Sequence, residues 1–450
     1  MASKKEVKKG LKYSIYDGTA SAMRKAINTK YLTPFLLFFG ASNEFIGIAN
    51  SIPNLLGHFS QMSTSFLLRI FKSKYKVTQY TAFLGRIMWL PMILAPAFLE
   101  NGLWWALLFL TFSYIFRDIA TTAWTSWMID LVPEKHRGVY FGKRNMIGET
   151  FSLVAAFLAG WFLGIMNNYL GFLIIFLIST MFGMISNYYL TKIPDFGDHR
   201  SHHKMRFSYR HFIKGITHHS NFSNFTMYMF FMYLGINIVS PFFAVYMLKN
   251  LDIGYLWFAI VTSIYTLFMI IGHRYWGNLS DKFGDEPIMI ITGSMLVLTP
   301  FIYLLSSTVF HLSLVNMIVG FSFAGFSLAQ FNYLLDIVPK NESPVFISNY
   351  KFIIGLTAFT SPLIGGFLLD HVFNKITIMG YTGIYLLFIL AIILRLLPNL
   401  FFFNRMKEIR IKRRSVLRNL FFQTIAVYPT VKILHEIKLL AHHLHRKQKK

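Results

Sequence analysis

Apolar residues occur along this chain in runs of about 20 residues or more, separated by short polar or charged connectors. An α-helix needs a run of that length to cross the hydrocarbon core of a bilayer. The apolar residues do not alternate every second position, so the runs favour helices over the strands of a membrane barrel. The predicted spans are roughly 16–41, 43–70, 78–99, 103–131, 139–166, 169–193, 218–248, 255–276, 287–306, 312–337, 344–371 and 380–402.

One half of the chain repeats the other. The tetrapeptide Asp-Leu-Val-Pro at 130–133 returns as Asp-Ile-Val-Pro at 336–339, and Gly160 corresponds to Gly366 at the same offset of 206 residues. Internal repetition decides the architecture of a chain before any other pattern does. The repeat therefore predicts an all-α membrane protein of about 12 transmembrane helices in two pseudo-symmetric six-helix halves.

Composition supports the membrane assignment. The chain is 54% hydrophobic and only 14% charged, which is more apolar than a soluble domain. Its formal charge of +25 resides in connectors and tails, so we interpret the cations as positive-inside anchors and expect no nucleic acid partner. The absence of cysteine excludes disulfides and thiolate metal sites.

The basic connectors alternate with connectors that are poor in cations, which predicts a multi-pass protein of the cell membrane with both termini in the cytoplasm. The first residues lack the apolar core of a removable signal peptide. We divide the chain into a basic N-terminal segment (1–15), a six-helix half (16–193), a His-rich basic linker (194–217), a second half (218–402) and a basic tail (403–450).

The tail mixes apolar residues with cations, and we expect it to lie as an amphipathic helix on the anionic inner leaflet, with a disordered tail as the alternative. In the linker, the adjacent His202 and His203 are a candidate metal site, but a solvated linker is the favoured interpretation.

A compact motif follows the span at 255–276. It consists of Gly277, a small residue at 280, Asp281, Lys282 and Gly284. The motif resembles the signature loop of the major facilitator superfamily, which lies on the cytoplasmic side between the second and third helices of a half. The resemblance implies the major facilitator fold and a gate in which glycine allows close helix approach and Asp281 pairs with cations of the other half. A plain solvated turn is the alternative.

The first half contains a second family-like loop, formed by Pro133, Glu134, Arg137 and Gly138, which resembles the loop after the fourth helix in that superfamily. Two departures from the family pattern predict that the two halves contribute unequally to the gate. Asp285 and Glu286 stand where the family usually has basic residues, and the first-half counterpart of the signature loop, at 69–74, lacks an aspartate.

We single out four ionisable residues of the first half that lie within the predicted spans, where charge is costly and residues are functional candidates by default. They are Lys30, Arg117, Asp118 and Glu149. The repeat replaces them in the second half by Asn237, Phe323, Ala324 and Gly355, which predicts a charged wall facing an aromatic and amide wall. Consecutive helical residues diverge by about 100°, so we expect the side chains at 117 and 118 to have different partners. Structural ion pairing is the alternative interpretation.

Uncharged polar residues complete the candidate site for the substrate or a coupling proton. These are Tyr233, Asn237, Gln330 and Asn332, which can bind solute or simply join helices. In the superfamily, the first, fourth, seventh and tenth helices line the cavity, and Arg117 resembles an arginine that recurs in the fourth. The fifth span lacks the proline-rich pattern of the family's drug/proton antiporters.

We therefore expect a secondary active transporter that moves a small solute by alternating access, driven by a gradient of protons, another ion or a solute. A nontransporting sensor or scaffold with the same fold is the alternative. No metal cluster, nucleophile motif or phosphate loop indicates an enzyme, and we expect no cofactor. Membrane lipids are the other expected partners, and the protein is expected to be a monomer.

Overall fold

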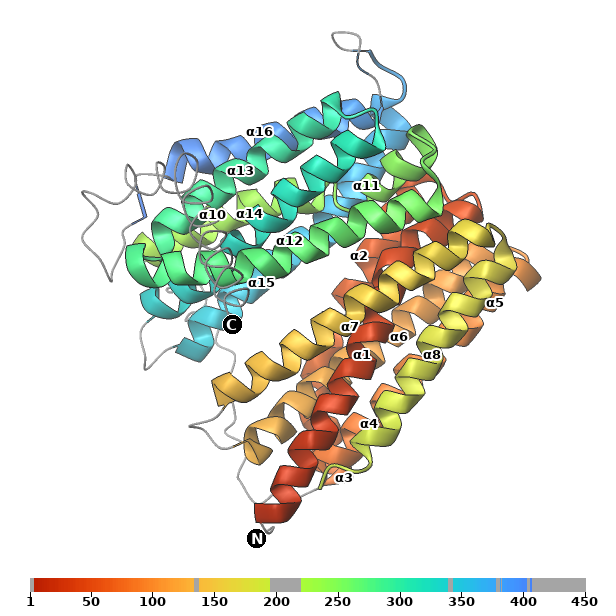
Figure 1. Ribbon diagram of the computed structural model, residues 1–450, viewed down its shortest axis with the longest axis vertical. Coiled ribbons are helices and arrows are strands. Elements are labelled where there is room, and N and C mark those ends of the chain that lie inside the picture. Colours follow the sequence, from red (N-terminus) through yellow and green to blue (C-terminus); the bar gives the residue numbers. More distant parts are fainter. Residues whose placement is uncertain are drawn as a thin grey trace, which may run out of the picture.

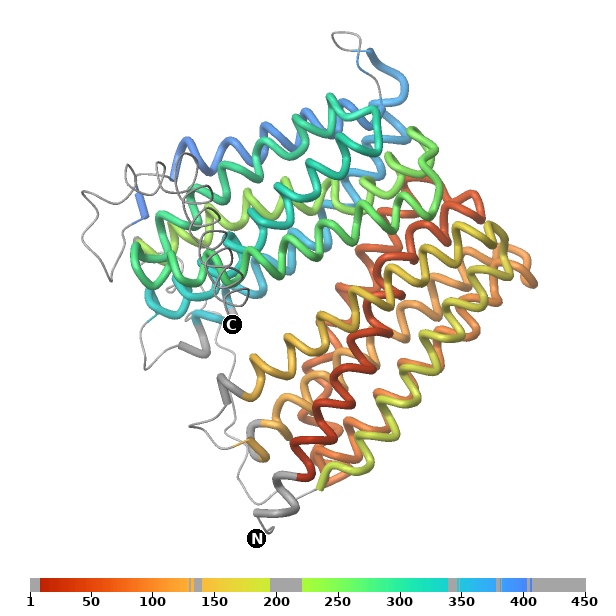
Figure 2. Tube along the Cα trace, in the orientation of Figure 1, coloured from red at the N-terminus to blue at the C-terminus, as the bar shows by residue number. Residues whose placement is uncertain are grey.

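The computed structural model describes residues 4–132, 137–194, 220–338, 343–377, 381, 383–402 and 405–406. These residues form two helical bundles, one from each half of the chain (Figure 1). Figure 2 shows the separation by colour, with red to yellow-green segments in one bundle and green to blue segments in the other. The predicted all-α architecture in two halves is confirmed.

The first bundle corresponds to the first six predicted spans, two of which are interrupted. Its elements are α1 (Lys4–Phe38), α2 (Asn43–Ser60), the 3₁₀ turn η1 (Gln61–Ser63), α3 (Thr64–Phe71), α4 (Lys74–Ile87), α5 (Trp89–Phe98), α6 (Gly102–Leu131), α7 (Arg137–Ile165) and α8 (Tyr169–Leu190).

The second bundle repeats this order. Its elements are α10 (Ser220–Asn237), α11 (Phe242–Val245), the π-helical turn η3 (Tyr246–Asn250), α12 (Gly254–Phe283), α13 (Asp285–Leu305), α14 (Val309–Ile337), α15 (Ser343–Phe367), the π-helical turn η4 (Leu368–Phe373) and α16 (Ile384–Phe402). Within the described residues, 10 helical segments are long and apolar enough to cross a membrane. The two remaining spans of the twelve predicted are the more polar α1 and the segment formed by α2, η1 and α3.

Helix ends follow local chemistry. Val132 is extended (φ −93°, ψ 118°) after the end of α6, as expected for a residue that precedes proline. The side chains of Ser42, Ser73 and Asn168 cap α2, α4 and α8 by accepting a backbone N–H three residues ahead. Two boundaries differ from the prediction, because α1 already begins at Lys4 and α12 continues to Phe283.

The apolar core is shared at one end of the molecule and divided at the other. One cluster of buried residues joins Tyr31 and Phe172 of the first half to Phe242, Phe258 and Phe388 of the second. Three further clusters each belong to a single half. The two halves are therefore fused through side chains at one end only.

Glycines allow the halves to touch at that end. A Cβ atom at Gly47 of α2 would lie 2.4 Å from the Pro362 carbonyl oxygen of α15, and one at Gly160 of α7 would lie 2.2 Å from the Ala259 Cβ of α12. A Cβ atom at Gly366 would lie 2.5 Å from the Asn43 carbonyl oxygen. We call this the closed end.

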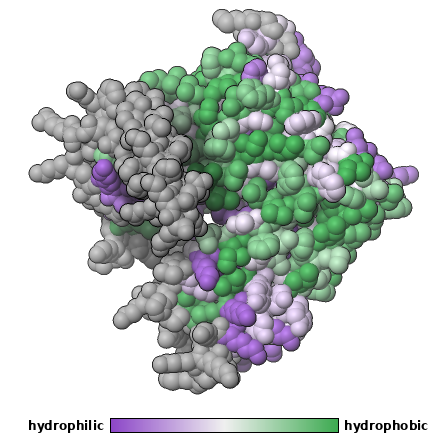
Figure 3. Space-filling model, viewed as in Figure 1, coloured by the Kyte–Doolittle hydropathy of each residue, from purple (hydrophilic) through white to green (hydrophobic). Residues whose placement is uncertain are grey.

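The opposite end, where α1 begins and α12 finishes, is called the open end. In Figure 1, α7 and α12 diverge from the closed end toward the open end. The space-filling view shows a recess between the halves with hydrophilic residues at its rim (Figure 3). Apolar residues cover the middle of the visible surface, as expected for helices that face lipid.

Candidate functional site

The ionisable residues of α6 form one connected group. Arg117 Nε donates a hydrogen bond of 2.7 Å to Asp118 Oδ1, and the guanidinium lies 3.8 Å from the centre of the Tyr114 ring. The other carboxylate oxygen, Oδ2, lies 3.2 Å from His58 Nδ1 of α2. The prediction of different partners for residues 117 and 118 is thus wrong, because the long arginine stem bends back to its neighbour.

Burial makes this group distinctive. The Asp118 side chain is only 8% exposed, whereas that of Arg117 is 33% exposed. A Cβ atom at Gly57 would lie 2.8 Å from Asp118 Oδ2, so the glycine of α2 gives the carboxylate its space. When His58 is protonated, the Asp118 carboxylate lies between two cationic side chains. Part of the Arg117 side chain remains accessible to solvent.

Lys30 reaches across the boundary between the halves. Its ammonium lies 3.3 Å from the Thr262 carbonyl oxygen and 3.2 Å from Thr266 Oγ1, both on α12. It is therefore bound to neutral oxygens of the second half and not to the pair on α6. Its neighbour Tyr31 packs edge-on against Phe258 in the shared core.

Glu149 is exposed on α7 and lies apart from the α6 pair. It shares an electrostatic environment with Lys25, an exposed residue of α1 that also interacts with the charges of Arg24, Arg117 and Asp118. The structure thus brings two of the four predicted charges into direct contact, places the third at the interface between the halves and leaves the fourth on an exposed face.

The polar residues of the second half mostly bond to one another. Tyr233 donates to Gln330 Oε1 (2.7 Å), and Gln330 Nε2 lies 2.6 Å from the Tyr350 hydroxyl, which joins α10, α14 and α15. Asn237 donates to Thr357 Oγ1 at 3.2 Å. These contacts fit the helix-joining interpretation in this conformation. They also place a chain of neutral hydrogen-bonding groups on α10, α14 and α15.

Asn332 belongs to a different site, near the end of α12. Its amide donates to Asp285 Oδ1 at 3.2 Å, and Ser280 Oγ donates to the same oxygen. Asp285 and Glu286 are 0% and 1% exposed. The two carboxylates that depart from the family pattern are therefore part of the buried packing at the start of α13.

The signature residues lie on a helix and not in a loop. Gly277, Asp281 and Lys282 occupy the last turns of α12, and Gly284, with φ +89°, makes the turn into α13. Only glycine adopts that φ readily. A Cβ atom at Gly277 would meet Leu328 at an ordinary 3.8 Å, so the predicted need for close approach there is wrong. Asp281 and Lys282 are exposed, and the described part of the chain shows no partner for Asp281.

Several predicted positions lie outside the described residues. Pro133 and Glu134 are among them, as are the linker histidines His202 and His203 and nearly all of the tail. Arg137 and Gly138 are described only as backbone at the start of α7.

Sequence reasoning missed a second charged network in the first half. Asp17 accepts a hydrogen bond from Ser186 (2.6 Å) and pairs with Arg144 (3.3 Å), while Arg86 donates to Ser186 (2.7 Å) and Asn187 (3.0 Å). Arg86 lies inside an apolar span, so the rule that selected Arg117 would have found it. The network joins α1, α4, α7 and α8.

Arg395 on α16 is a buried cation of the second half that the same rule would have found. It is 2% exposed and donates to the carbonyl oxygens of Gly235 (3.0 Å) and Leu296 (2.8 Å). The Leu296 carbonyl would ordinarily accept from the residue four positions later, which is Pro300 and has no N–H. Gly235 lies in the last turn of α10, where carbonyls lose their intrahelical donors. Arg395 therefore replaces two missing backbone donors.

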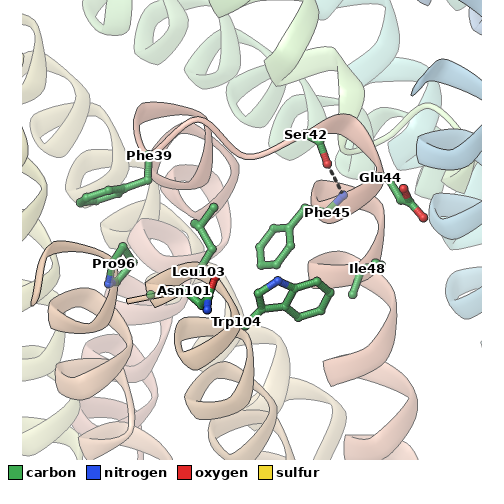
Figure 4. A pocket seen from close by; sticks show the side chains of 10 residues that line it. Phe39, Ser42, Glu44, Phe45, Ile48, Pro96, Asn101, Leu103 and Trp104 are labelled. Carbon is green, nitrogen blue, oxygen red and sulfur yellow. Dashed lines mark hydrogen bonds between the residues drawn. The ribbon is translucent and has the colours of Figure 1, made fainter. Parts of the chain in front are cut away.

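A surface pocket of about 510 Å³ lies at the closed end of the first half, between the turns that follow α1 and α5. Figure 4 shows Phe45 and Trp104 inside it and Glu44 turned away; the two rings meet edge-on with centroids 5.2 Å apart. None of the four predicted charges lines the pocket. The lining residues all belong to the first half, so we do not assign the solute site to this pocket.

Solved structures share this fold. A bacterial homologue of the human lysosomal transporter Spinster, in an inward-facing and unoccupied conformation, is 14% identical, with a TM-score of 0.66 over 90% of this chain and 98% of that one. A mutant of the nucleoside transporter NupG is 14% identical, with a TM-score of 0.67 over 89% and 100% of the two chains. A bacterial homologue of the iron transporter ferroportin, in an inward-facing state, is 12% identical, with a TM-score of 0.68 over 90% and 99%.

The comparison with curated proteins found no match. The sequence profile of the Major Facilitator Superfamily matches residues 225–432. The second half of the chain therefore carries the sequence pattern of this superfamily. The profile match covers the second half and part of the tail, and the internal repeat relates the first half to it. The predicted resemblance to this superfamily is confirmed over the second half, and the predicted fold and general class of membrane transporter are confirmed, whereas the roles of individual residues stay predictions.

Proposed function

We propose that this protein is a secondary transporter whose solute site lies between the two halves, and that the structure represents its inward-facing conformation. One observation carries the proposal. The halves share a core and touch through glycines at the closed end, while α7 and α12 diverge toward the open end (Figure 1). A cavity open at one end only is what alternating access requires of each resting state.

The distribution of cations supports a cytoplasmic open end. Lys72, Lys74, Lys143 and Lys282 lie at or near the open end. The connectors of the closed end carry fewer cations, with uncharged residues such as Asn168 and Ser306 alongside Lys249 and Lys375. By the positive-inside rule, the open end faces the cytoplasm, and the protein is a multi-pass protein of the cell membrane with both termini inside.

Transport then requires the halves to rock. The closed end must separate and the open end must meet, which would bring Asp281 toward the first half and give it the partner that the described residues lack in this state. The charged set at Lys30, Arg117, Asp118 and Glu149 would form the first-half wall of the solute site. Tyr233, Asn237 and Gln330 would supply neutral groups from the second half. Binding of a proton or another ion to the carboxylates would couple its gradient to solute transport. The sequence contains no ATP-binding loop, so we expect a gradient and not ATP to supply the energy.

The direct contacts at the closed end provide the test. Asn43 Nδ2 and the Glu44 backbone N–H both donate to the Asp370 carboxylate, at 2.7 Å each. The chain has no cysteine, so the double variant Asn43→Cys/Asp370→Cys contains only these two thiols. A short reagent with two thiol-reactive groups can therefore form one defined cross-link between them. Cross-linking should prevent the closed end from separating, and so prevent the change from the inward-facing to the outward-facing conformation. Solute flux in proteoliposomes should then be abolished. The single variant Asp370→Cys, treated identically, is the control.

Spin labels give a readout that needs no substrate. Labels at Lys143→Cys and Lys282→Cys report the open end, and labels at Glu100→Cys and Lys375→Cys report the closed end; all four positions are exposed. Coupled changes of opposite sign in the two distances support alternating access. One rigid distance distribution at both ends under all solutes and ion gradients, with no flux, would instead favour the sensor or scaffold.

A further inference from the structure

We infer that the solute is a small organic anion, bound by the cations of the first-half wall. The inference rests on the proposed transport function and concerns the same site. It is carried by an excess of positive charge that the described residues do not neutralise. Along α1 and α6, the cations Arg24, Lys25, Lys30 and Arg117 outnumber the carboxylates that act on them among the described residues, Asp118 and Glu149, while the Asp17 carboxylate of α1 pairs with Arg144.

Arg24 is the sharpest case. Its Nε is buried and, among the described residues, has no hydrogen-bond acceptor. The ionised side chains that act on it are Arg86 and Arg117, both of the same sign. The residue as a whole is partly buried, and a cation partly withdrawn from water without a counter-charge is destabilised, the more so beside like charges. Such a group is stabilised when an anion enters its surroundings.

The other two cations in the membrane-spanning part of α1, Lys25 and Lys30, are also available to an anion. Lys30 is bound to the neutral oxygens of Thr262 and Thr266 and pairs with no carboxylate of the described residues. Lys25 is exposed one residue after Arg24, and of the two carboxylates that act on it, Asp118 is already paired with Arg117. The three cations lie within two turns of one helix.

The carboxylates cannot balance them. Asp118 is already engaged by Arg117 and by His58. The helices of the second half add no acid at this depth, because α10 and α15 contain no aspartate or glutamate and the only acids of α12 and α14 are Asp281 and Asp336, near their ends. The second half instead offers the Tyr233–Gln330–Tyr350 chain of neutral polar groups.

Arg117 is arranged as a receptor for an anion. Its Nε is fixed by Asp118 and one face of its guanidinium rests on Tyr114, so its orientation is set before a ligand arrives. The side chain nevertheless remains 33% exposed. A planar guanidinium held in this way suits a carboxylate or a phosphate, both of which accept two parallel hydrogen bonds. The neutral part of the anion would meet the hydroxyl and amide groups of the second half.

The excess charge can be measured without knowing the solute. Thr29 is exposed one turn after Lys25, so Thr29→Cys places a single thiol beside the cations. We compare its rates of modification by an anionic reagent, sulfonatoethyl methanethiosulfonate, and a cationic one, trimethylammonioethyl methanethiosulfonate, each divided by the rate for free cysteine. A local excess of two positive charges should favour the anionic reagent roughly tenfold. High salt should reduce this preference.

Matched variants tie the effect to named residues. Lys25→Met in the Thr29→Cys background should lower the preference severalfold, whereas Lys375→Met, which removes an exposed cation at the closed end, should leave it unchanged. A corrected ratio near one at Thr29→Cys, or equal effects of the two lysine substitutions, would overturn the inference. Lys25 is exposed, so its substitution is not expected to prevent folding.

Matched solutes separate this inference from the transport proposal. We pair succinate with succinamide and glucose 6-phosphate with glucose, and measure melting temperature and proteoliposome flux. The anionic member of at least one pair should raise the melting temperature and its neutral partner should not. Binding of an anion without flux supports the anion site and contradicts transport. Flux of a neutral member without binding of its anionic partner supports transport and overturns the anion site.

Discussion

Replacing Gly366 by alanine should shift the protein toward the outward-facing conformation without unfolding it. The new Cβ atom would lie 2.5 Å from the Asn43 carbonyl oxygen and 2.9 Å from the Glu44 Cα, both backbone atoms of the other half. Backbone cannot move aside as a flexible side chain does. The clash exists only while the closed end is shut, so it penalises one conformation and spares the other.

The magnitude follows from packing. Overfilling a tight contact costs about 1–3 kcal/mol. A difference of that size between two conformations changes their ratio by about 5- to 150-fold. Alanine also favours helix over glycine by roughly 0.5–1 kcal/mol, but this gain is the same in both conformations and cancels from their ratio. We therefore expect a large change in conformer populations and little loss of overall stability.

Two other glycines serve as controls. Gly355 lies on the same helix, and a Cβ atom there meets nothing within 4 Å, so Gly355→Ala should leave the populations unchanged. Gly320 lies on α14, and its Cβ atom would be 2.1 Å from the Tyr265 carbonyl oxygen within the second half. Gly320→Ala should therefore lower the melting temperature without a shift between conformers.

Spin-label distances provide the assay, with one pair at Lys143 and Lys282 and another at Glu100 and Lys375. For Gly366→Ala, the open-end distance should shorten and the closed-end distance should lengthen. If Gly366→Ala and Gly355→Ala give the same distributions, the glycine contact does not hold the closed end. If Gly366→Ala merely unfolds the protein as Gly320→Ala does, the contact belongs to the fold and not to a gate.

Two further predictions concern single side chains. Arg395→Lys keeps the buried charge but cannot serve both Gly235 and Leu296, so it should destabilise the protein by about 1.5–3 kcal/mol in thermal or denaturant unfolding; an unchanged melting temperature would show that Arg395 does not satisfy these carbonyls. Asp281→Asn should leave stability unaltered, because the residue is exposed here, but should enrich the inward-facing conformer in spin-label distances. Equal distributions for variant and parent would make Asp281 an ordinary helix-end residue.

The helical spans were predictable because bilayer thickness imposes a length on each apolar run, and the break before Pro133 follows from proline sterics. The extension of α12 to Phe283 was not predictable from hydropathy. The segment from Gly277 to Lys282 is polar, yet it continues the helix into water until Gly284 provides a positive φ. Polarity ends a membrane span but does not end a helix.

The candidate site was predictable in its residues and less so in its contacts. Lys30, Arg117 and Asp118 stand out because charge is rare in hydrocarbon. The pairing of Arg117 with Asp118 depends on a side-chain bend, and the contact of Lys30 with Thr262 depends on how two distant helices pack. Arg24 and Lys25 escaped notice because they stand in a segment that is polar throughout, where single charges do not contrast with their neighbours.

The contact of Lys30 with α12 marks the pivot of the molecule. Contacts between the halves run along α12 from Tyr255, which meets Phe172, down to Thr266. The eleven steps along this stretch rise about 16 Å, roughly half of the hydrocarbon thickness. Each half then works as a lever whose arm toward the open end is the longer one, because the contact lies nearer to Phe38 of α1 and to Gly254 of α12 than to their other ends. A group at the pivot travels little while the ends sweep through large arcs, so a solute held near Lys30 can stay in place as its access changes from one side of the membrane to the other.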